Sequence, residues 1–307
     1  MAGSKVVVQV PGTTANLGPG FDCLGVALSL HNQFEFIIQE TSASPVEIAV
    51  VGEEATGVSQ NTDNLLYRAF AKFYEQLGQS LPPVKINIEL GVPLSRGLGS
   101  SATAIVGGLL AANALSGNPL EEWDLLQIAI ALEGHPDNIV PAFLGGCRLS
   151  IPRDEHWEVC EIPWSDHFVP VVAIPDFELS TPEARSVLPS QVSREVAIFN
   201  TAHLGLLLRA LETGNSDWLR LGMQDQLHQP YRQQLISGYP QVEEAALSAG
   251  AYGVAISGAG PTLLAITNVE QANQVAEAMK TAWEKEGVKA TVSPLEVNAT
   301  GATIVHY

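Results

Sequence analysis

Basic residues are scarce in this chain. Its 307 residues include 15 Lys and Arg against 33 Asp and Glu, so the formal net charge is −18. A surface of that sign repels the phosphates of nucleic acids and of anionic membranes, and we expect neither as a partner. It would equally repel a nucleotide, so a phosphate-binding site in this protein has to gather its few positive groups locally.

Cysteines and long apolar runs are also few. The three cysteines, Cys23, Cys147 and Cys160, are widely spaced and form no Cys-x-x-Cys pair, which argues against a disulfide framework or structural zinc and favours a reducing compartment. The first residues, Met1–Lys5, do not lead into the apolar core of a signal peptide. No uninterrupted run of about 18 apolar residues occurs, so we expect no spanning helix and a cytoplasmic location.

The composition is that of a folded protein, with 46% hydrophobic and 16% charged residues. A chain of this length forms one large or two medium domains. Alternating or β-branched segments predict strands in the first half; they are Lys5–Val10, Leu24–Leu30, Gln33–Gln39, Val46–Val51 and Val84–Leu90.

Helix signals separate these strands. A helix over Leu65–Leu77 is expected, capped by Asp63 or Asn64 and ended by Gly78. Two more are expected over residues 102–115 and about 120–132, after which the prolines and glycines of residues 136–146 should break the chain.

The second half has a different pattern. Its expected order is a strand over Val169–Ile174, a helix over Arg194–Leu211, a hairpin of Tyr252–Ile256 with Thr262–Thr267, a helix over 270–285 and a strand near 289–293. This order resembles a split β-α-β unit. We therefore expect an α+β protein with a strand-rich N-terminal domain at residues 1–158 and a ferredoxin-like C-terminal domain at 159–307.

The most informative segment runs from Pro93 to Thr103, between a predicted strand and a predicted helix. It carries Gly97, Gly99, Ser100 and Ser101 at the helix start, where backbone N–H groups lack internal partners and the helix dipole is positive. Glycine lets the backbone approach a bulky anion, and serine hydroxyls add donors or a metal ligand. The segment predicts a phosphate-binding site.

Two other interpretations of this segment stay open. It lacks the lysine of the common P-loop, but residues 97–102 match Gly-x-Gly-x-x-Ala, a variant of the dinucleotide-binding fingerprint. A nicotinamide-dependent oxidoreductase is therefore an alternative, weakened because Glu121 and Glu122 begin a helical segment instead of ending a second strand. The plainest alternative is a tight turn that enters a helix.

Two further glycine-rich loops accompany the first, at residues 11–22 and 256–262. With these three loops in this order, nearly the whole chain resembles the GHMP kinases, which phosphorylate small alcohols. Within that superfamily it is most similar to the branch that phosphorylates homoserine. Four segments carry the likeness: Thr14–Asp22, Leu132–Asn138, Ala184–Pro189 and Asp225–Arg232.

The resemblance implies ATP and Mg²⁺ as cofactors and L-homoserine as the substrate, and it leaves a homodimer open. It implies a nucleotide-binding segment of Pro93, Leu94, Ser95, Arg96, Gly97, Leu98, Gly99, Ser100, Ser101, Ala102 and Thr103. Ser101 and Glu133 would ligate Mg²⁺, a hard ion that prefers oxygen. The plain alternative for Glu133 is a solvated residue at a helix end.

The resemblance also assigns a substrate pocket. Its residues are Asn16, Asp22, His135, Arg185 and Arg232. A guanidinium matches the carboxylate of an amino acid in a bidentate manner, whereas Asn16 and Asp22 would contact the hydroxyl end. The alternatives are ordinary turn chemistry for the first two and surface positions for the arginines.

The catalytic residues implied are Glu133, Asn138 and Arg185. Asn138 offers no carboxylate, which agrees with direct passage of the hydroxyl proton to phosphate. Asp22 and Asp137 stay open as bases. A zinc or iron site at Glu133, His135 and Asp137 also stays open. Two other functions stay open as well: a GHMP kinase for another alcohol, and a non-catalytic effector-binding protein.

Overall fold

The computed structural model describes residues 3–40, 42 and 44–306. Its first sheet has the strand order β11-β1-β2-β4-β3, and a hairpin of β5 and β6 extends from β2. The strands are β1 (Lys5–Asn16), β2 (Gly20–Ile38), β3 (Val46–Val51), β4 (Val84–Glu89), β5 (Cys147–Arg153), β6 (His156–Ile162) and β11 (Thr303–His306). All pairs are antiparallel except β3 with β4.

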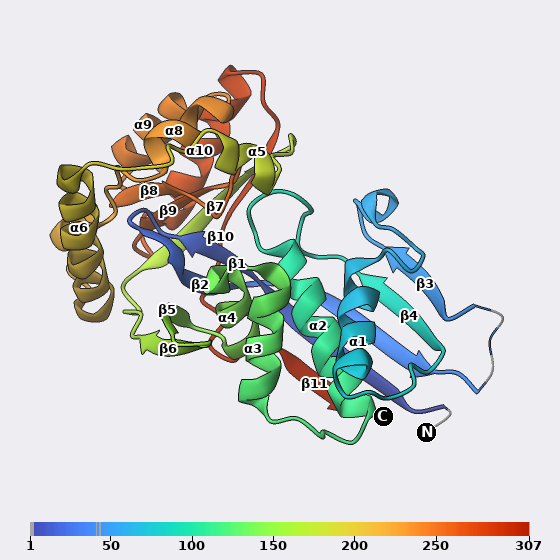
Figure 1. The fold of residues 1–307 in the computed structure, drawn as a ribbon. Helices are drawn as coiled ribbons and strands as arrows, with labels where there is room; N and C mark the ends of the chain where they lie inside the picture. Colours follow the sequence, from blue (N-terminus) through green and yellow to red (C-terminus); the bar gives the residue numbers. More distant parts are fainter. Residues whose placement is uncertain (1–2, 41, 43, 307) are drawn as a thin grey trace.

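Four helices cover one face of this sheet (Figure 1). They are α1 (Leu65–Gln76), α2 (Ser100–Leu115), α3 (Glu122–Glu133) and α4 (Pro136–Leu144), and a short 3-10 turn η1 (Ala55–Gly57) precedes α1. The helix expected over Leu65–Leu77 is confirmed as α1, which buries Leu66, Phe70 and Phe73. Asn64 caps the helix by accepting from the backbone N–H groups of Leu66 and Tyr67.

Two local predictions in this half are wrong. The segments Leu24–Leu30 and Gln33–Gln39 form one strand, because β1 stays paired with it through His31 and Asn32. Residues 136–144 are helical instead of broken. Pro136 occupies the first turn, where its missing N–H is not needed, and Pro141 is accommodated inside the helix.

The second sheet has the order β10-β7-β9-β8, all antiparallel. Its strands are β7 (Val169–Pro175), β8 (Gly253–Ile256), β9 (Leu263–Thr267) and β10 (Ala290–Pro294). Strand β9 pairs antiparallel with both β7 and β8, so these two strands run parallel to each other on either side of it. This is the split β-α-β arrangement expected from the sequence.

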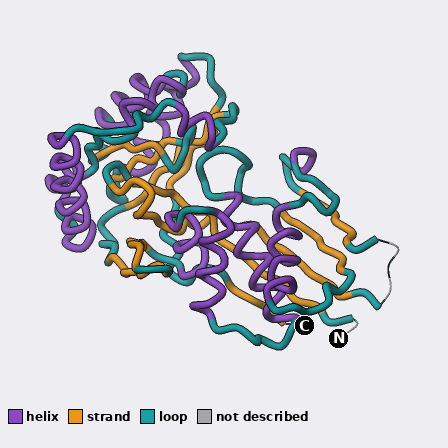
Figure 2. The backbone as a smooth tube through the Cα atoms, viewed as in Figure 1, coloured by secondary structure: helices purple, strands orange, loops and turns teal. Residues whose placement is uncertain are grey.

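The helices of this half lie around this second sheet (Figure 2). They are α5 (Thr181–Ser186), α6 (Arg194–Thr213), α7 (Ser216–Gly222), α8 (Gln229–Arg232), α9 (Tyr239–Ser248), α10 (Ala272–Lys285) and the 3-10 turn η2 (Gln233–Leu235).

Strand β9 joins two hydrophobic cores. Leu263 and Ala265 face a core made with α9 and α10, whereas Leu264 and Ile266 face a second core shared with β2, α6 and α7. Both faces of the strand are therefore covered, which explains its continuous apolar run. The shared core holds the two sheets together.

The predicted division between residues 158 and 159 stays a prediction. The polypeptide passes from the first sheet to the second between β6 and β7, and β11 returns at the C-terminal end to pair with β1.

No helix of the described residues is both long enough and apolar enough to cross a membrane.

Candidate active site

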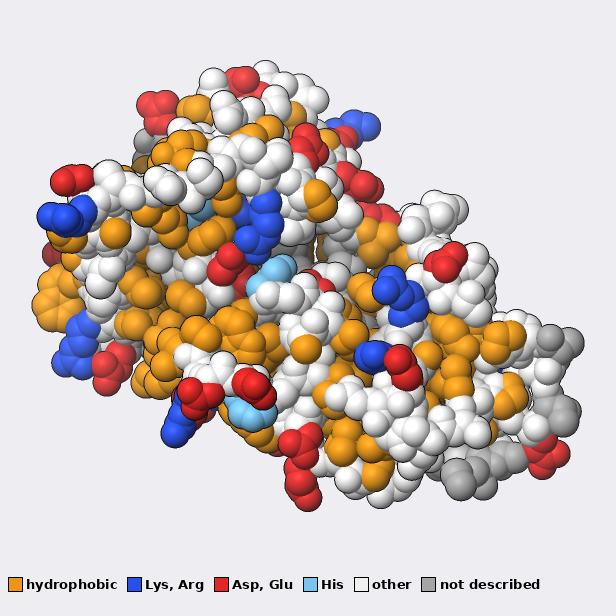
Figure 3. All heavy atoms as spheres, in the orientation of Figure 1, with side chains coloured by type: hydrophobic (Ala, Val, Ile, Leu, Met, Phe, Trp, Pro, Cys, Tyr) orange, Lys and Arg blue, Asp and Glu red, His pale blue; other side chains and the backbone are white. Residues whose placement is uncertain are grey.

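A cavity of about 530 Å³ lies between the two halves of the molecule. Figure 3 shows basic, acidic and histidine side chains gathered at the hollow there. The predicted site residues that line the cavity are Asn16, Asp22, Leu94, Ser95, Arg96, Gly97, Gly99, Ser100, Ser101, Glu133, His135, Asn138, Arg185 and Arg232. The tip of α2 thus opens toward both Glu133 and Arg185.

Part of the predicted nucleotide segment lies behind this wall. The side chains of Leu98, Ala102 and Thr103 are buried in the protein, and Pro93 is not among the lining residues. These three buried residues are likewise absent from the cavity lining.

The glycine loop requires its glycines for geometry. Gly97 and Gly99 have φ values of +75° and +67°, a region that L side chains rarely occupy. A Cβ at Gly97 would overlap the carbonyl oxygen of Ser257, and one at Gly99 would overlap the hydroxyl of Thr13. One side of the loop packs against Ser257 and Thr13, and the other side faces the cavity.

The loop around Ser257 packs against the glycine loop and supports it. The Ser257 hydroxyl donates to the carbonyl of Gly97 at 2.6 Å, and the N–H of Thr262 donates to the carbonyl of Arg96 at 3.3 Å. The Arg96 guanidinium donates to the carbonyls of Leu94, Pro175 and Asp176. Arg96 therefore ties the loop to the second sheet.

Ser101 and Glu133 meet at the start of α2. The Ser101 hydroxyl donates to Oε1 of Glu133 at 2.5 Å, although the two residues begin and end different helices. Two oxygen donors beside a phosphate-binding helix end suit Mg²⁺, which takes few protein ligands and completes its shell with water and phosphate oxygens.

Asp22 and Arg185 pair across the cavity. The guanidinium donates from Nη1 to Oδ2 at 3.0 Å and from Nη2 to Oδ1 at 2.8 Å. Arg185 lies on α5, whose N-cap is Ser180. The carboxylate raises the pKa of Arg185 further above its ordinary value, so the guanidinium stays charged.

Arg232 lies deeper than Arg185, with an exposed fraction of 2%. It donates to the carbonyls of Ala184 and Gly258 and lies over the ring of Phe21. Burial lowers the pKa of Arg232 to about 10, which still leaves it charged at neutral pH. Arg232 therefore adds its positive charge to that of Arg185 at this end of the cavity.

Asn16 has its side chain occupied within the protein. Its Nδ2 donates to the carbonyl of Gly258 at 2.9 Å, and its Oδ1 accepts from the N–H of Asp22 at 3.0 Å. These two bonds tie the turn of residues 16–22 to the second sheet. Asn16 therefore places Asp22 at the cavity.

A chain of polar side chains leads from His135 to Thr13. Nδ1 of His135 lies 2.8 Å from Oδ1 of Asp137, Nδ2 of Asn138 lies 3.4 Å from the same oxygen, and the Thr13 hydroxyl lies 2.8 Å from Oδ1 of Asn138. The hydrogen bond with Asp137 raises the pKa of His135. Asn138 and His135 are thereby oriented beside the α2 tip.

Comparison with known proteins decides the family. Models of the GHMP kinase N-terminal and C-terminal domains match residues 64–146 and 207–285. A homoserine kinase of Trichormus variabilis is 60% identical over 300 residues, covering 98% of this chain and 99% of that protein. The chain belongs to the GHMP kinases. It is an ATP-dependent small-molecule kinase by family.

Other relatives agree. A homoserine kinase of Trichodesmium erythraeum is 60% identical over 97% of this chain and 98% of its own. The crystal structure of a Cytophaga hutchinsonii homoserine kinase has a TM-score of 0.89 at 30% identity, covering 98% of this chain and 97% of that one. An L. major mevalonate kinase, at 15% identity and a TM-score of 0.72 over 97% of each chain, shares the fold.

The nicotinamide alternative does not survive in this GHMP kinase. Strand β4, which leads into the loop, pairs antiparallel with β2, so the loop does not leave a doubly wound parallel sheet. The zinc or iron alternative also lacks support, since no cluster of three or more potential His, Cys, Asp or Glu ligands occurs in the part of the chain that the structure describes.

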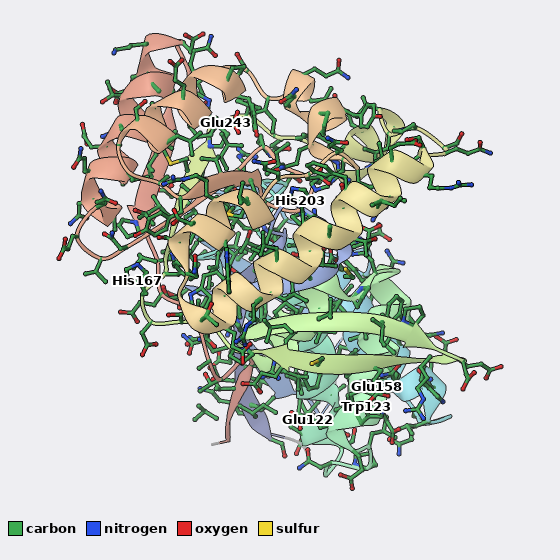
Figure 4. All side chains as sticks on the ribbon, turned by 90° about the vertical axis from the view of Figure 1, so that its left-hand side faces the viewer. Glu122, Trp123, Glu158, His167, His203 and Glu243 are labelled. Atoms are coloured by element: carbon green, nitrogen blue, oxygen red, sulfur yellow. The ribbon has the colours of Figure 1, made fainter. Side chains whose placement is uncertain are left out.

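Sequence reasoning missed His228 and Phe21. The His228 ring is fully buried, stacks on Phe21 at 4.9 Å between centroids and lies 2.9 Å from the carbonyl of Gly18. Phe21 in turn lies under Arg232. The segment Asp225–Arg232 stands out in the sequence only as a likeness, because burial of a histidine leaves no signal in its spacing. His203 on α6 (Figure 4) stacks on Phe199 and bonds its carbonyl, which gives this histidine a structural role.

Proposed function

We propose that this protein transfers the terminal phosphate of ATP to the hydroxyl of L-homoserine, forming O-phospho-L-homoserine and ADP in threonine biosynthesis. One observation carries the proposal: the phosphate-binding end of α2 and the Asp22–Arg185 pair line the same cavity. The likeness to proteins named homoserine kinase over nearly the full chain supports the choice of alcohol.

The nucleotide would lie along the glycine loop. Backbone N–H groups of the first turn of α2 would bind its phosphates. Leu66, Ile88, Leu90 and Leu94 give one end of the cavity an apolar wall, which suits the base. Ser101 and Glu133 would hold Mg²⁺, which when bound neutralises charge on the phosphates.

Homoserine would enter at the charged end. Its carboxylate would pair with Arg185 and Arg232. We assign its ammonium to Asp22, because ammonium and carboxylate share one carbon and the Asp22 carboxylate lies beside Arg185. This places Asp22 at the amino-acid end of the substrate instead of the hydroxyl end that the sequence suggested.

Asn138 would hold the hydroxyl for attack. The hydroxyl oxygen bonds to the γ-phosphorus, the bond from that phosphorus to the bridging oxygen breaks, and ADP leaves. Asp137 already accepts from His135 and Asn138. We therefore propose that the hydroxyl proton passes to the transferred phosphate without a dedicated base.

The deciding experiment measures ADP release with ATP and Mg²⁺ and each of four alcohols: homoserine, mevalonate, galactose and shikimate. We expect release above background with homoserine alone. Equal release with another alcohol would make the protein a different GHMP kinase, and no release with any would favour a non-catalytic effector-binding protein.

A cytoplasmic location and a homodimer are further proposals. The three cysteines are free thiols, which supports a reducing compartment. Cell fractionation tests the location, and sedimentation equilibrium tests the dimer.

A further inference from the structure

We propose that Thr13 is a positioning residue for phosphoryl transfer: its hydroxyl orients the Asn138 amide and its backbone holds the glycine loop, so one residue sets the acceptor against the donor. Thr13 lies on β1 and is fully buried. It does not line the cavity, so it acts through its neighbours. The inference rests on the proposed function, in which Asn138 holds the substrate hydroxyl.

The orientation of the Asn138 amide follows from its two partners. Nδ2 faces Oδ1 of Asp137 at 3.4 Å, and Oδ1 faces the Thr13 hydroxyl at 2.8 Å. A flipped amide would turn its oxygen toward the Asp137 carboxylate, where two acceptors repel. With the amide as it stands, the Thr13 hydroxyl donates to one lone pair of Oδ1.

The second lone pair of that oxygen is then free for the substrate. A bound substrate hydroxyl that donates its hydrogen to Oδ1 of Asn138 keeps a lone pair of its own for the phosphorus. As the new O–P bond forms, that hydrogen leaves the amide oxygen and passes to the transferred phosphate. Without the Thr13 hydroxyl, the amide would keep only the long contact to Asp137 and could rotate. Misplacement of a reacting group by about 1 Å costs on the order of 100-fold in rate.

Thr13 also contacts the glycine loop, which would bind the phosphates of ATP. Its backbone N–H donates to the carbonyl of Leu98 at 3.0 Å, and its side chain fills the space where a Cβ of Gly99 would stand. The Asn138 oxygen borders the same space, near 3.1 Å from that Cβ position. Thr13 therefore contacts both the loop that would carry the phosphates and the amide that would carry the alcohol.

The test replaces Thr13 with Val, which keeps the shape and the backbone N–H but removes the hydroxyl. We expect kcat to fall about 10- to 100-fold with little change in the KM for ATP. Thr13→Ser, which keeps the hydroxyl, should restore most of the rate. The matched control is Thr14→Val: Thr14 is the next buried residue of the same strand, and its hydroxyl has no hydrogen-bond partner among the described residues. That variant should keep the kcat of the unmodified protein.

Each outcome of these measurements either supports or contradicts the role of Thr13. If Thr13→Val keeps its kcat, or if it loses rate no more than Thr14→Val, the inference is wrong while the proposed function stands. A loss confined to the midpoint of thermal unfolding would make Thr13 merely structural. If the valine variant does not fold, the comparison of Thr13→Ser with Thr13→Ala carries the test, since both lack the methyl group and only one has the hydroxyl. An unmodified protein without homoserine-dependent ADP release would instead overturn the proposed function.

Discussion

The guanidinium of Arg185 and the carboxylate of Asp22 hold each other through two hydrogen bonds of 2.8 and 3.0 Å, although 163 positions separate them in the chain. The pair joins α5 to the first residues of β2. A zwitterionic amino acid carries the same two charges on neighbouring atoms. The pair therefore presents to such a substrate a complement for each of its charged groups.

Replacing Arg185 with Ala should reduce kcat/KM for homoserine by about 100-fold or more, because a bidentate partner of the substrate is lost. Stability should change little. Side-chain exposures of 38% and 34% leave the ion pair screened by water, and such pairs contribute at most about 1 kcal/mol. Steady-state kinetics and thermal unfolding separate the two effects. Arg185→Lys keeps the charge but loses the bidentate geometry, so its kcat/KM should lie between those of the unmodified protein and Arg185→Ala. A fall in unfolding temperature as severe as the fall in rate would point to a structural arginine.

Much of this arrangement was predictable from local sequence. The glycine loop, the cap at Asn64 and the split β-α-β order each depend on residues close together in the chain. The resemblance of four motifs to the GHMP kinases then assigned Asp22, Glu133 and Arg185 to one site. Local sequence rules could not make that assignment, because these residues are far apart in the chain.

What could not be predicted depends on tertiary packing. Leu98 and Ala102 belong to the predicted nucleotide segment, yet their side chains are buried. The helical state of residues 136–144 runs against the two prolines in it, which local rules treat as breaks. The burial of His228 and the hydrogen bond from Thr13 to Asn138 join residues far apart in sequence.

Glu133 provides a test of the metal site. Glu133→Gln keeps the size of the side chain and removes its charge, so the Mg²⁺ concentration for half-maximal rate should rise at least about 10-fold. The measurement is ADP release across a Mg²⁺ titration at constant ATP. Glu122→Gln, an exposed substitution in the first turn of the same helix, is the matched control. An unchanged Mg²⁺ requirement in the Glu133 variant would remove this residue from the metal site.

Gly99 and Gly117 form another matched pair, one at each end of α2. Both have positive φ values, +67° and +84°, so alanine costs about 1–2 kcal/mol of backbone strain at either position. Only at Gly99 would the new Cβ also overlap the Thr13 hydroxyl, since nothing lies within 4 Å of that position at Gly117. We expect Gly99→Ala to lose more stability and to weaken ATP binding, and Gly117→Ala to keep its ATP affinity. Equal ATP affinities, measured by calorimetry, would contradict the placement of the nucleotide.

His228 makes the stability depend on pH. Burial lowers the pKa of this histidine below its ordinary value, so the folded protein keeps it neutral while the unfolded chain takes up a proton first as the pH falls. Its contribution is therefore fully present above about pH 6.5 and is lost progressively on acidification toward the lower folded value. His228→Gln removes the buried ring stacked on Phe21 and should lower the free energy of unfolding at pH 8. At pH 5.5 the unmodified protein has lost part of this stability, so the difference in free energy of unfolding between it and the variant should be smaller than at pH 8. Denaturant unfolding of both at the two pH values measures this, and a difference that widens on acidification would mean that the folded protein holds His228 protonated.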